Sequence, residues 1–230
     1  MISSIGILTR RDDMSSEQFC DYWRNGHGPL AAKLPGLRRY LQNHVVDSTQ
    51  LAIDHARGDW NVAGFSQLYF DDASAMNRAV ASAEFLPTVP DVRRFCSDVK
   101  VVVCQPNVVV PVSDQPEPLI KRMSILTRRP DISPQRFRDE WVGFHAEAVG
   151  KFPNLMGYTQ NLVIERIGSD LTKPATHDQI PVDGIVELWF RTVEDIRAAF
   201  ASPAAGRSQR HALDFIGTIT TYLVEAQVIV

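Results

Sequence analysis

Two histidines at matching positions are the residues of this sequence best suited to proton transfer. His27 lies in the segment NGHGP (25–29), where the glycines leave little side-chain bulk around the imidazole and are expected to end the helix. Because histidine titrates near neutral pH, one that faces a pocket is a natural general acid or base. The alternative is a histidine that closes a helix and binds its terminal carbonyl groups. His145 occupies the matching position without the glycines or the proline, so the sequence favours His27 for function.

A second group of candidates lies on two related β-rich runs, 64–70 and 184–190. Every second residue of each run shares one face, and this face is expected to point between two sheets. Its members are Phe65, Gln67, Tyr69, Ile185, Glu187 and Trp189. Mixed aromatic and polar groups there are typical of a ligand pocket, so we expect the aromatic and amide members to bind substrate. Burial would raise the pKa of Glu187 and make it a usable acid. The alternative is a carboxyl solvated at the rim or paired with an arginine.

Three polar residues alternate along a further strand expected at 37–46. Tyr40, Gln42 and His44 share one face, so we expect His44 to be a catalytic candidate and the other two to contact substrate. The counterpart of His44 in the second half is Leu162, and the fold of both halves therefore does not require a histidine there.

Arginine pairs follow the first strand of each half, at 10–11 and 128–129. They could bind a substrate carboxylate. Solvated charges that protect a strand end are the favoured interpretation.

These candidates lie on two copies of one unit. Residues 7–43 align with residues 125–161 without a gap, and 17 of the 37 positions are identical. Later parts match at an offset of 120. Such self-similarity at a fixed spacing indicates an internal duplication. Each copy follows the order strand, helix, strand, strand, helix, strand, judged from residue alternation and helix-start signals.

The order βαββαβ predicts an α+β fold made of two ferredoxin-like repeats, residues 1–110 and 119–230. The Pro-rich segment 111–118 is expected to be a stiff, extended linker. One such sheet leaves its second face uncovered. We therefore expect the two sheets to cover each other as a fused, pseudo-dimeric α/β barrel of eight strands, with room inside for side chains or one small ligand.

Composition excludes several classes of function. The net charge is -3, which offers no basic field for nucleic acid. Three cysteines without metal-like spacing fit a reducing compartment, and no apolar run is long enough to span a membrane. The N-terminus does not read as a signal peptide, so a cytoplasmic location is expected. No metal-ligand spacing and no phosphate-binding loop is present in the sequence, and we expect neither a metal nor a cofactor.

The pattern LTRRxDMSxExFxxYWxxxHxPLAAKLPGLRRYxQN, from Leu8 to Asn43, resembles the EthD family of the dimeric α/β-barrel superfamily. A diverged version from Leu126 to Asn161 keeps the LTRR, the Trp and the His. The resemblance implies ferredoxin-like units that pair into a barrel with a central cavity. It also implies relatives that include cofactor-free dehydratases and isomerases of polyketide or lactone metabolism, and proteins tied to ether degradation. The family histidine maps to His27 and, in weaker form, to His145.

Two functions remain open from the sequence. The first is a cofactor-independent lyase (dehydratase) or isomerase, in which His27, His44 and Glu187 move protons on a small, partly apolar cyclic metabolite in the barrel cavity. The second is a module that binds or sequesters a hydrophobic small molecule without turnover. The expected partner is a small-molecule substrate in either case. The sequence also leaves open whether the fused barrel pairs again into a homodimer.

Overall fold

Each copy folds into a four-stranded antiparallel sheet with its helices on one face. The structure is a computed structural model and describes residues 1–112 and 118–230. The strands of the first copy are β1 (Ile2–Arg10), β2 (Arg39–Asp47), β3 (Gly64–Phe70) and β4 (Cys96–Val110). Those of the second are β5 (Ile120–Arg128), β6 (Gly157–Ile167), β7 (Gly184–Phe190) and β8 (Ile216–Val228). The α+β order expected from the sequence is confirmed.

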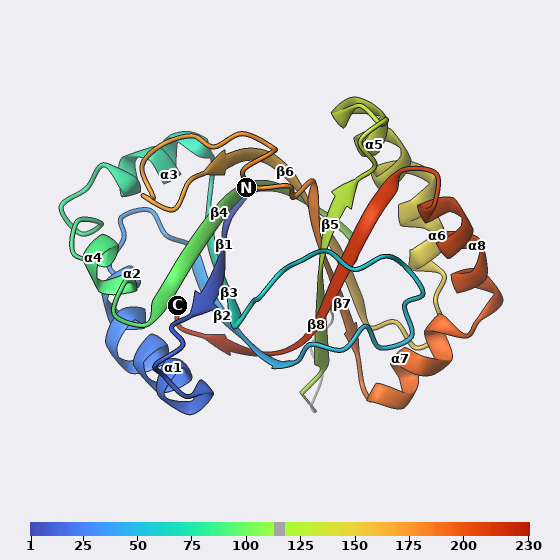
Figure 1. Cartoon of the computed structure of the whole chain (residues 1–230), viewed down its shortest axis with the longest axis horizontal. Coiled ribbons are helices and arrows are strands. Elements are labelled where there is room, and N and C mark those ends of the chain that lie inside the picture. The colour runs from blue at the N-terminus through green and yellow to red at the C-terminus, as the bar shows by residue number, and fades with distance from the viewer. Residues whose placement is uncertain (113–117) are drawn as a thin grey trace.

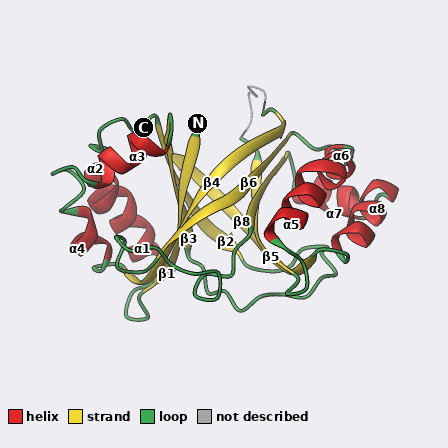
Figure 2. Cartoon of the chain, turned by 90° about the horizontal axis from the view of Figure 1, so that it is seen from above, coloured by secondary structure: helices red, strands yellow, loops and turns green. Residues whose placement is uncertain are grey.

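Helices of each copy cover the outer face of its own sheet, at opposite ends of the molecule (Figure 2). The first copy has α1 (Ser16–Tyr22), the π-helical turn η1 (Trp23–His27), α2 (Gly28–Ala31), α3 (Ala73–Val80) and α4 (Thr88–Val92). The second has α5 (Pro134–Glu140), η2 (Trp141–His145), α6 (Ala146–Gly150), α7 (Val193–Phe200) and α8 (Pro203–Ala212). The Ser15 side chain caps α1 in a reciprocal arrangement with Gln18, as its capping-box spacing predicts.

The two sheets close into one barrel with the strand order β1-β3-β2-β8-β5-β7-β6-β4. Closure comes from two antiparallel pairings between the copies, β2 with β8 and β4 with β6. Each copy therefore supplies the partner for both open edges of the other, which removes the exposed sheet edges that a single ferredoxin-like unit would leave. The predicted fused barrel is confirmed. Of the expected linker at 111–118, residues 113–117 lie outside the described residues.

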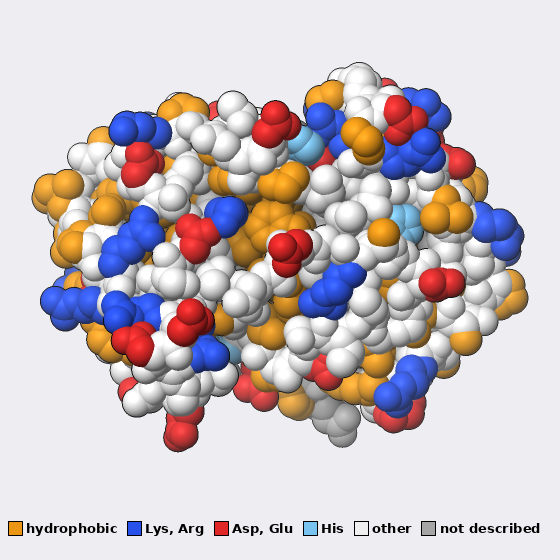
Figure 3. Space-filling view, viewed as in Figure 1, with side chains coloured by type: hydrophobic (Ala, Val, Ile, Leu, Met, Phe, Trp, Pro, Cys, Tyr) orange, Lys and Arg blue, Asp and Glu red, His pale blue; other side chains and the backbone are white. Residues whose placement is uncertain are grey.

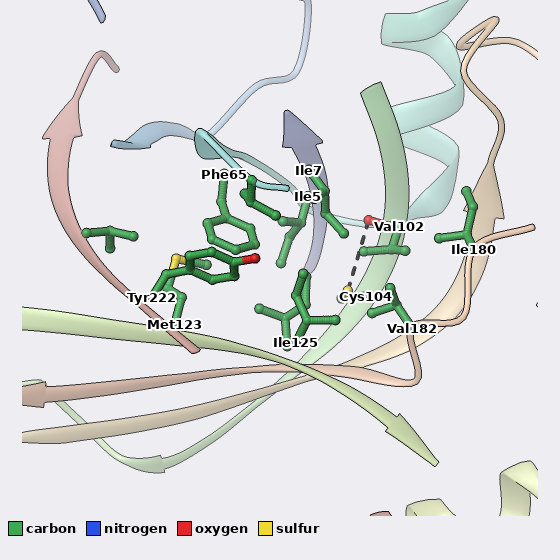
Figure 4. Packing of buried hydrophobic residues seen from close by; sticks show 13 residues of the cluster. Ile5, Ile7, Phe65, Val102, Cys104, Met123, Ile125, Ile180, Val182 and Tyr222 are labelled. Carbon is green, nitrogen blue, oxygen red and sulfur yellow. Dashed lines mark hydrogen bonds between the residues drawn. The ribbon is translucent and has the colours of Figure 1, made fainter. Parts of the chain in front are cut away.

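The barrel interior holds an apolar cluster built from both copies (Figure 4). Ile5, Phe65, Met123, Ile185 and Tyr222 are members, and each is at most 1% exposed. Phe65 and Ile185 come from β3 and β7, so the face expected to point between the sheets does so. The predicted alternation along these strands is confirmed.

One expectation about the first helix is wrong. The glycines around His27 were expected to end the helix, but the chain stays helical through η1 into α2. Gly28 has φ -51° and ψ -50°, an ordinary right-handed helical conformation. Pro29 falls in the first turn of α2, directly after η1, and has no N–H to donate to the preceding turn. The widened turn therefore carries His27 within a continuous helical segment.

Two long loops cross from one copy to the other (Figure 1). The loop 48–63, between β2 and β3, reaches over the second copy, where the Gln50 side chain donates to the Ile219 carbonyl at 2.8 Å. The loop 168–183, between β6 and β7, reaches over the first copy, where Leu171 packs against its core. Each copy thus supplies part of the cover for the helices and sheet of the other.

Charged side chains of both signs are mixed over the face shown in Figure 3, around a central patch of hydrophobic ones. None of the helices in the described part of the chain has the length and apolar character needed to cross a membrane.

Candidate functional site

A cavity of about 120 Å³ lies between the helices of the first copy and the outer face of its sheet. We call it the first cavity. Its walls are mostly apolar and include Trp23, Leu34, Phe70, Met76, Phe95 and Val101. Ile167 and Leu171 of the second copy complete the wall. The polar side chains that line it are few: Ser4, His27, Ser66 and Thr88. An apolar chamber with a small number of placed polar groups is typical of a small-molecule site.

His27 in this wall is held by a carboxylate from another helix. Its Nδ1 lies 2.9 Å from Oδ2 of Asp91, on α4. The other carboxylate oxygen, Oδ1, accepts a hydrogen bond from the Tyr22 hydroxyl at 2.7 Å. The His27 ring packs on Phe95 with the centroids 5.1 Å apart. The imidazole is therefore fixed in position on one side by a carboxylate and on another by an aromatic ring.

Burial lowers the pKa of His27, and the hydrogen bond and charge of Asp91 only partly oppose that effect. The imidazole is then neutral at neutral pH and carries one N–H. Because Asp91 accepts from Nδ1, the proton resides there and Nε2 keeps its lone pair. Nε2 has no hydrogen-bond partner among the described residues. The arrangement is that of a general base oriented by a carboxylate.

Tyr40, Gln42 and His44 lie on the same side of the sheet, beneath η1, and do not line the first cavity. The Gln42 amide donates to the Trp23 carbonyl at 2.8 Å, and the Trp23 indole donates to the Tyr40 hydroxyl at 3.1 Å. His44 packs on the Trp23 ring with the centroids 4.6 Å apart, and burial lowers its pKa to about 4. In the structure these residues contact Trp23, and Trp23 in turn forms the cavity wall.

A glycine makes the position of this tryptophan possible. A Cβ atom added at Gly64 would lie only 2.4 Å from Cζ3 of Trp23. In the second copy a Cβ at Gly184 would lie equally close to Trp141. A side chain at either position would push the helical segment that carries the histidine away from the sheet.

Glu187 faces the barrel interior, as predicted, and forms an ion pair there. Its Oε2 lies 2.5 Å from Nζ of Lys121, and each side chain is 2% exposed. Asn161 and Gln67 donate to Oε1 at 2.6 and 2.7 Å. Lys121 also donates to Asn43 at 2.8 Å. The partner is thus a lysine from β5, where the sequence suggested an arginine as the alternative to a free acid.

The remaining predicted pocket residues surround this network. Phe65 is fully buried in the interior. The Tyr69 hydroxyl accepts from Gln67 at 3.2 Å, and the Trp189 ring lies with its centroid 5.2 Å from Lys121 Nζ. Burial and the Glu187 charge raise the pKa of Tyr69. The polar groups of this network accept and donate hydrogen bonds among themselves, so the network is a satisfied polar core.

The sheet therefore separates the predicted site residues into two groups. His27 lies on the helix side of the sheet, and so do Tyr40, Gln42 and His44. Glu187 and its hydrogen-bond partners lie in the barrel interior. The sequence placed all of them around one barrel cavity. Asp91 and Lys121, which bind His27 and Glu187, were not recognised. The sequence offered little to find them, since Asp91 is 64 residues from His27 along the chain.

A second cavity, of about 70 Å³, occupies the matching place in the second copy. We call it the second cavity. Its lining includes Trp141, His145, Val149, Phe152, Leu188 and Phe200, with Arg122 from β5. Ile53, Asp54 and His55 cover it from the crossing loop of the first copy.

The histidine of the second cavity has different partners. His145 Nδ1 lies 3.4 Å from Nδ1 of His211, whose Nε2 lies 3.1 Å from a Glu140 oxygen. Burial, together with the smaller effect of the neighbouring His211, lowers the pKa of His145 to about 3. His211 packs against His145 because α8, which carries it, contacts η2.

The arginine pairs at the strand ends are engaged by nearby carboxylates. Arg11 pairs with Asp13, and Arg129 pairs with Asp131, in exposed positions. Arg128 donates to Asp183 at 2.6 Å. This is the arrangement expected of charges that protect strand ends. In the part of the chain that the structure describes, no group of three or more His, Cys, Asp or Glu side chains is placed to hold a metal ion.

Comparison with known proteins gives a family and a fold. The EthD domain profile matches residues 11–98 and 129–218, one match in each copy. A solved structure described as an anthrone oxidase-like protein is similar, with a TM-score of 0.66 and 9% identity over 99% of this chain and 93% of that one. A proposed monooxygenase from Lactobacillus acidophilus NCFM is similar with a TM-score of 0.58 and 12% identity, over 99% and 94%. Likeness at these identities shows a shared fold. Among curated proteins, none matches this chain.

Proposed function

The chain belongs to the EthD family, and we propose that it is a cofactor-independent lyase or isomerase that moves protons on a small, partly apolar cyclic metabolite. The reacting group is His27 in the first cavity. One observation carries the proposal: the His27 Nδ1 lies 2.9 Å from a buried Asp91 carboxylate, in the wall of a mostly apolar cavity.

The geometry supports a two-step proton transfer. Nε2 of neutral His27 takes a proton from carbon, next to a carbonyl or similar electron-withdrawing group of the substrate. The imidazolium that forms is stabilised by Asp91, which accepts its Nδ1–H throughout. His27 then returns the proton. Delivery to a leaving hydroxyl releases water and completes a dehydration, whereas delivery to a different carbon completes an isomerisation.

The cavity walls match such a substrate. Apolar side chains exclude water and favour a neutral ring, and burial keeps the imidazole unprotonated and ready to act as a base. The Ser4 hydroxyl is the polar group that we assign to orient a substrate oxygen. The Thr88 hydroxyl already donates to the Phe85 carbonyl at 2.7 Å, and Ser66 is bonded to Tyr40. A module that only binds its ligand has no need of a carboxylate-oriented base, so the dyad favours catalysis over the binding function.

Deuterium exchange into a carbon acid tests the proposal without knowledge of the natural substrate. The probes are 2-indanone, 2-tetralone and cyclohex-2-enone in D₂O, followed by ¹H NMR. We expect the protein to accelerate exchange next to a carbonyl, and His27→Gln to reduce the rate by about 10²–10⁴-fold, the range for losing a general base. His145→Gln is the matched control and leaves the rate nearly unchanged.

The pH profile gives a second measure of the same base. Because burial lowers the pKa of His27, the exchange rate stays high below pH 6.5 and falls only as the pH drops through that lowered value.

Two results of the exchange experiment would contradict the proposal. The first is exchange that is equally fast in His27→Gln and in the wild type. The second is that the protein accelerates exchange of none of the three ketones over the rate in buffer.

A further inference from the structure

The second cavity contains a buried arginine that its counterpart in the first copy lacks. Arg122 on β5 is 0% exposed, and its guanidinium stacks over the Phe200 ring with Cζ 4.3 Å from the centroid. Both residues line the second cavity. The matching residue of the first cavity is Ser4, since the first strands align at an offset of 118. The duplication has therefore placed a fixed cation in one of two similar chambers.

Most hydrogen-bonding groups of this arginine are unused. Nη2 donates to the Gln50 carbonyl at 3.1 Å and to the Thr221 hydroxyl at 3.4 Å. Nε and Nη1 have no partner among the described residues, and no ion pair of Arg122 occurs among them. A guanidinium has five N–H donors, so three of the five remain without an acceptor. Buried donors and buried charges of this kind are normally paired.

The charge itself persists at neutral pH. Burial lowers the pKa of Arg122 to about 9, which still leaves the group protonated at pH 7. A buried cation without a counter-ion strongly destabilises the fold around it, and a bound anion would remove that penalty. The neighbouring His145 does not add a second positive charge, because its pKa is lowered to about 3.

The rest of the chamber indicates what kind of anion it would hold. The apolar part of the cavity wall includes Leu126, Val149, Phe152, Val186 and Leu188. Asp54 is the carboxylate that belongs to the lining. It lies in the loop from the first copy, is exposed, and forms no ion pair with Arg122. The chamber thus offers one cation at the sheet and mostly apolar walls, with a few neutral polar side chains such as Ser124, Ser208 and Gln209.

We propose that the second cavity binds a small carboxylate with an apolar body, whose carboxylate oxygens accept hydrogen bonds from the unpaired nitrogens of Arg122. The ligand lies between β5, α7 and α8, under the crossing loop of the first copy. Charge-assisted hydrogen bonds from a guanidinium to a carboxylate are strong and directional, which suits a site whose walls are mostly apolar. The site is separate from His27 and independent of the proton-transfer proposal.

Calorimetric titration tests this site with benzoate, hexanoate and butanoate as probes, and with benzamide as the neutral match of benzoate. We expect at least one carboxylate to bind, and benzamide to bind at least about tenfold more weakly than benzoate if benzoate is that ligand. Arg122→Met, which keeps the length of the side chain without its charge, should remove carboxylate binding. Ser4→Ala, the matched change in the first cavity, should leave it unchanged.

Thermal unfolding separates loss of the site from loss of the fold. Without ligand, Arg122→Met should melt at or above the wild-type temperature, because an uncompensated buried charge has been removed. The bound carboxylate should raise the melting temperature of the wild type and not that of Arg122→Met. Asp54→Asn should bind the carboxylate at least as tightly as the wild type.

Three results would overturn the proposal. They are carboxylate binding that persists in Arg122→Met, equal binding of benzoate and benzamide, and the absence of binding by all three carboxylates. A melting temperature that falls in both Arg122→Met and Asp54→Asn would instead identify Asp54 as the counter-ion of Arg122, and would also overturn it.

Discussion

The two copies keep the same frame and differ in the polar residues placed on it. In the first copy a histidine bonds a carboxylate, and the residue on β1 beneath the cavity is Ser4. In the second copy the matching histidine bonds another histidine, and the residue on β5 is Arg122. The packing around Trp23 in the first copy resembles the packing around Trp141 in the second. In each copy a glycine of the sheet leaves room for the tryptophan ring. The difference teaches that the frame can be preserved while the polar residues on it change, and our two proposals assign proton transfer to one chamber and anion binding to the other.

The barrel interior shows the same division between copies. Ser3 and Gln67 of the first copy correspond to Lys121 and Glu187 of the second. All four belong to one network, in which Ser3 donates to Asn161, Lys121 donates to Asn43 and Gln67 donates to Glu187. The second copy thus carries a buried ion pair where the first carries neutral groups. The interior is a shared core that both copies must complete.

The largest expected effect follows from separating the copies. β2 and β4 of the first copy are paired with β8 and β6 of the second, so residues 1–113 alone would expose two edges and one apolar sheet face. We expect this half to aggregate or to form a homodimer that imitates the fused barrel. Light scattering and calorimetry measure the result. A monomeric half with a cooperative melt would contradict the shared core.

The next effect concerns the interior ion pair. Lys121→Met leaves Glu187 buried without its cation and should lower the free energy of unfolding by about 3–5 kcal/mol. Adding Glu187→Gln, the residue type that the first copy has at this position, should restore most of the loss. Urea unfolding of the single and double variants measures the coupling. Additive losses in the double variant would mean that the two charges do not depend on each other.

The third prediction concerns Asp91, the carboxylate that orients His27 and that His145 lacks. Asp91→Asn removes the charge that holds the His27 Nδ1–H, and the exchange rate should fall by roughly 10²-fold. His211→Asn, the matched change beside His145, should have little effect on exchange. Equal losses in the two variants would mean that both cavities carry out proton transfer.

The smallest effect is a difference in how stability depends on pH. The folded pKa of His145 is about 3, below its unfolded value of 6.5, so the unfolded chain binds a proton more readily as the pH falls. Its contribution to stability is complete above pH 6.5 and decreases by about 2 kcal/mol at pH 5. His145→Gln should reduce the loss of stability between pH 7 and pH 5. His27→Gln should reduce it less, because Asp91 opposes the effect of burial there.

The fold could be predicted from the sequence because it depends on local residue patterns that occur in both copies. Alternation along the strands at 64–70 and 184–190 fixed which residues face the interior, and the capping box at Ser15 fixed a helix start. The need to cover two open sheets predicted the closed barrel, whereas the particular pairings of β2 with β8 and of β4 with β6 are known only from the structure.

The site could be predicted only in part, because its geometry depends on long-range contacts. Tyr40, Gln42 and His44 do share one face, but alternation alone cannot say whether that face points to the helices or to the barrel interior. The carboxylate of Asp91 reaches His27 only because α4 packs against η1. Arg122 stood within a β-rich run that was assigned to a strand, and its burial is visible only once the helices of the second copy are in place.

One NMR titration tests the central claim, that the two cavities are separate sites with opposite ligand preferences. The four indole N–H signals serve as reporters, because Trp23 lines the first cavity, Trp141 lines the second, and Trp60 and Trp189 line neither. The account predicts that neutral 2-indanone shifts the Trp23 signal and benzoate shifts the Trp141 signal. Shifts of the same indole by both ligands, or of Trp60 and Trp189 alone, would contradict it.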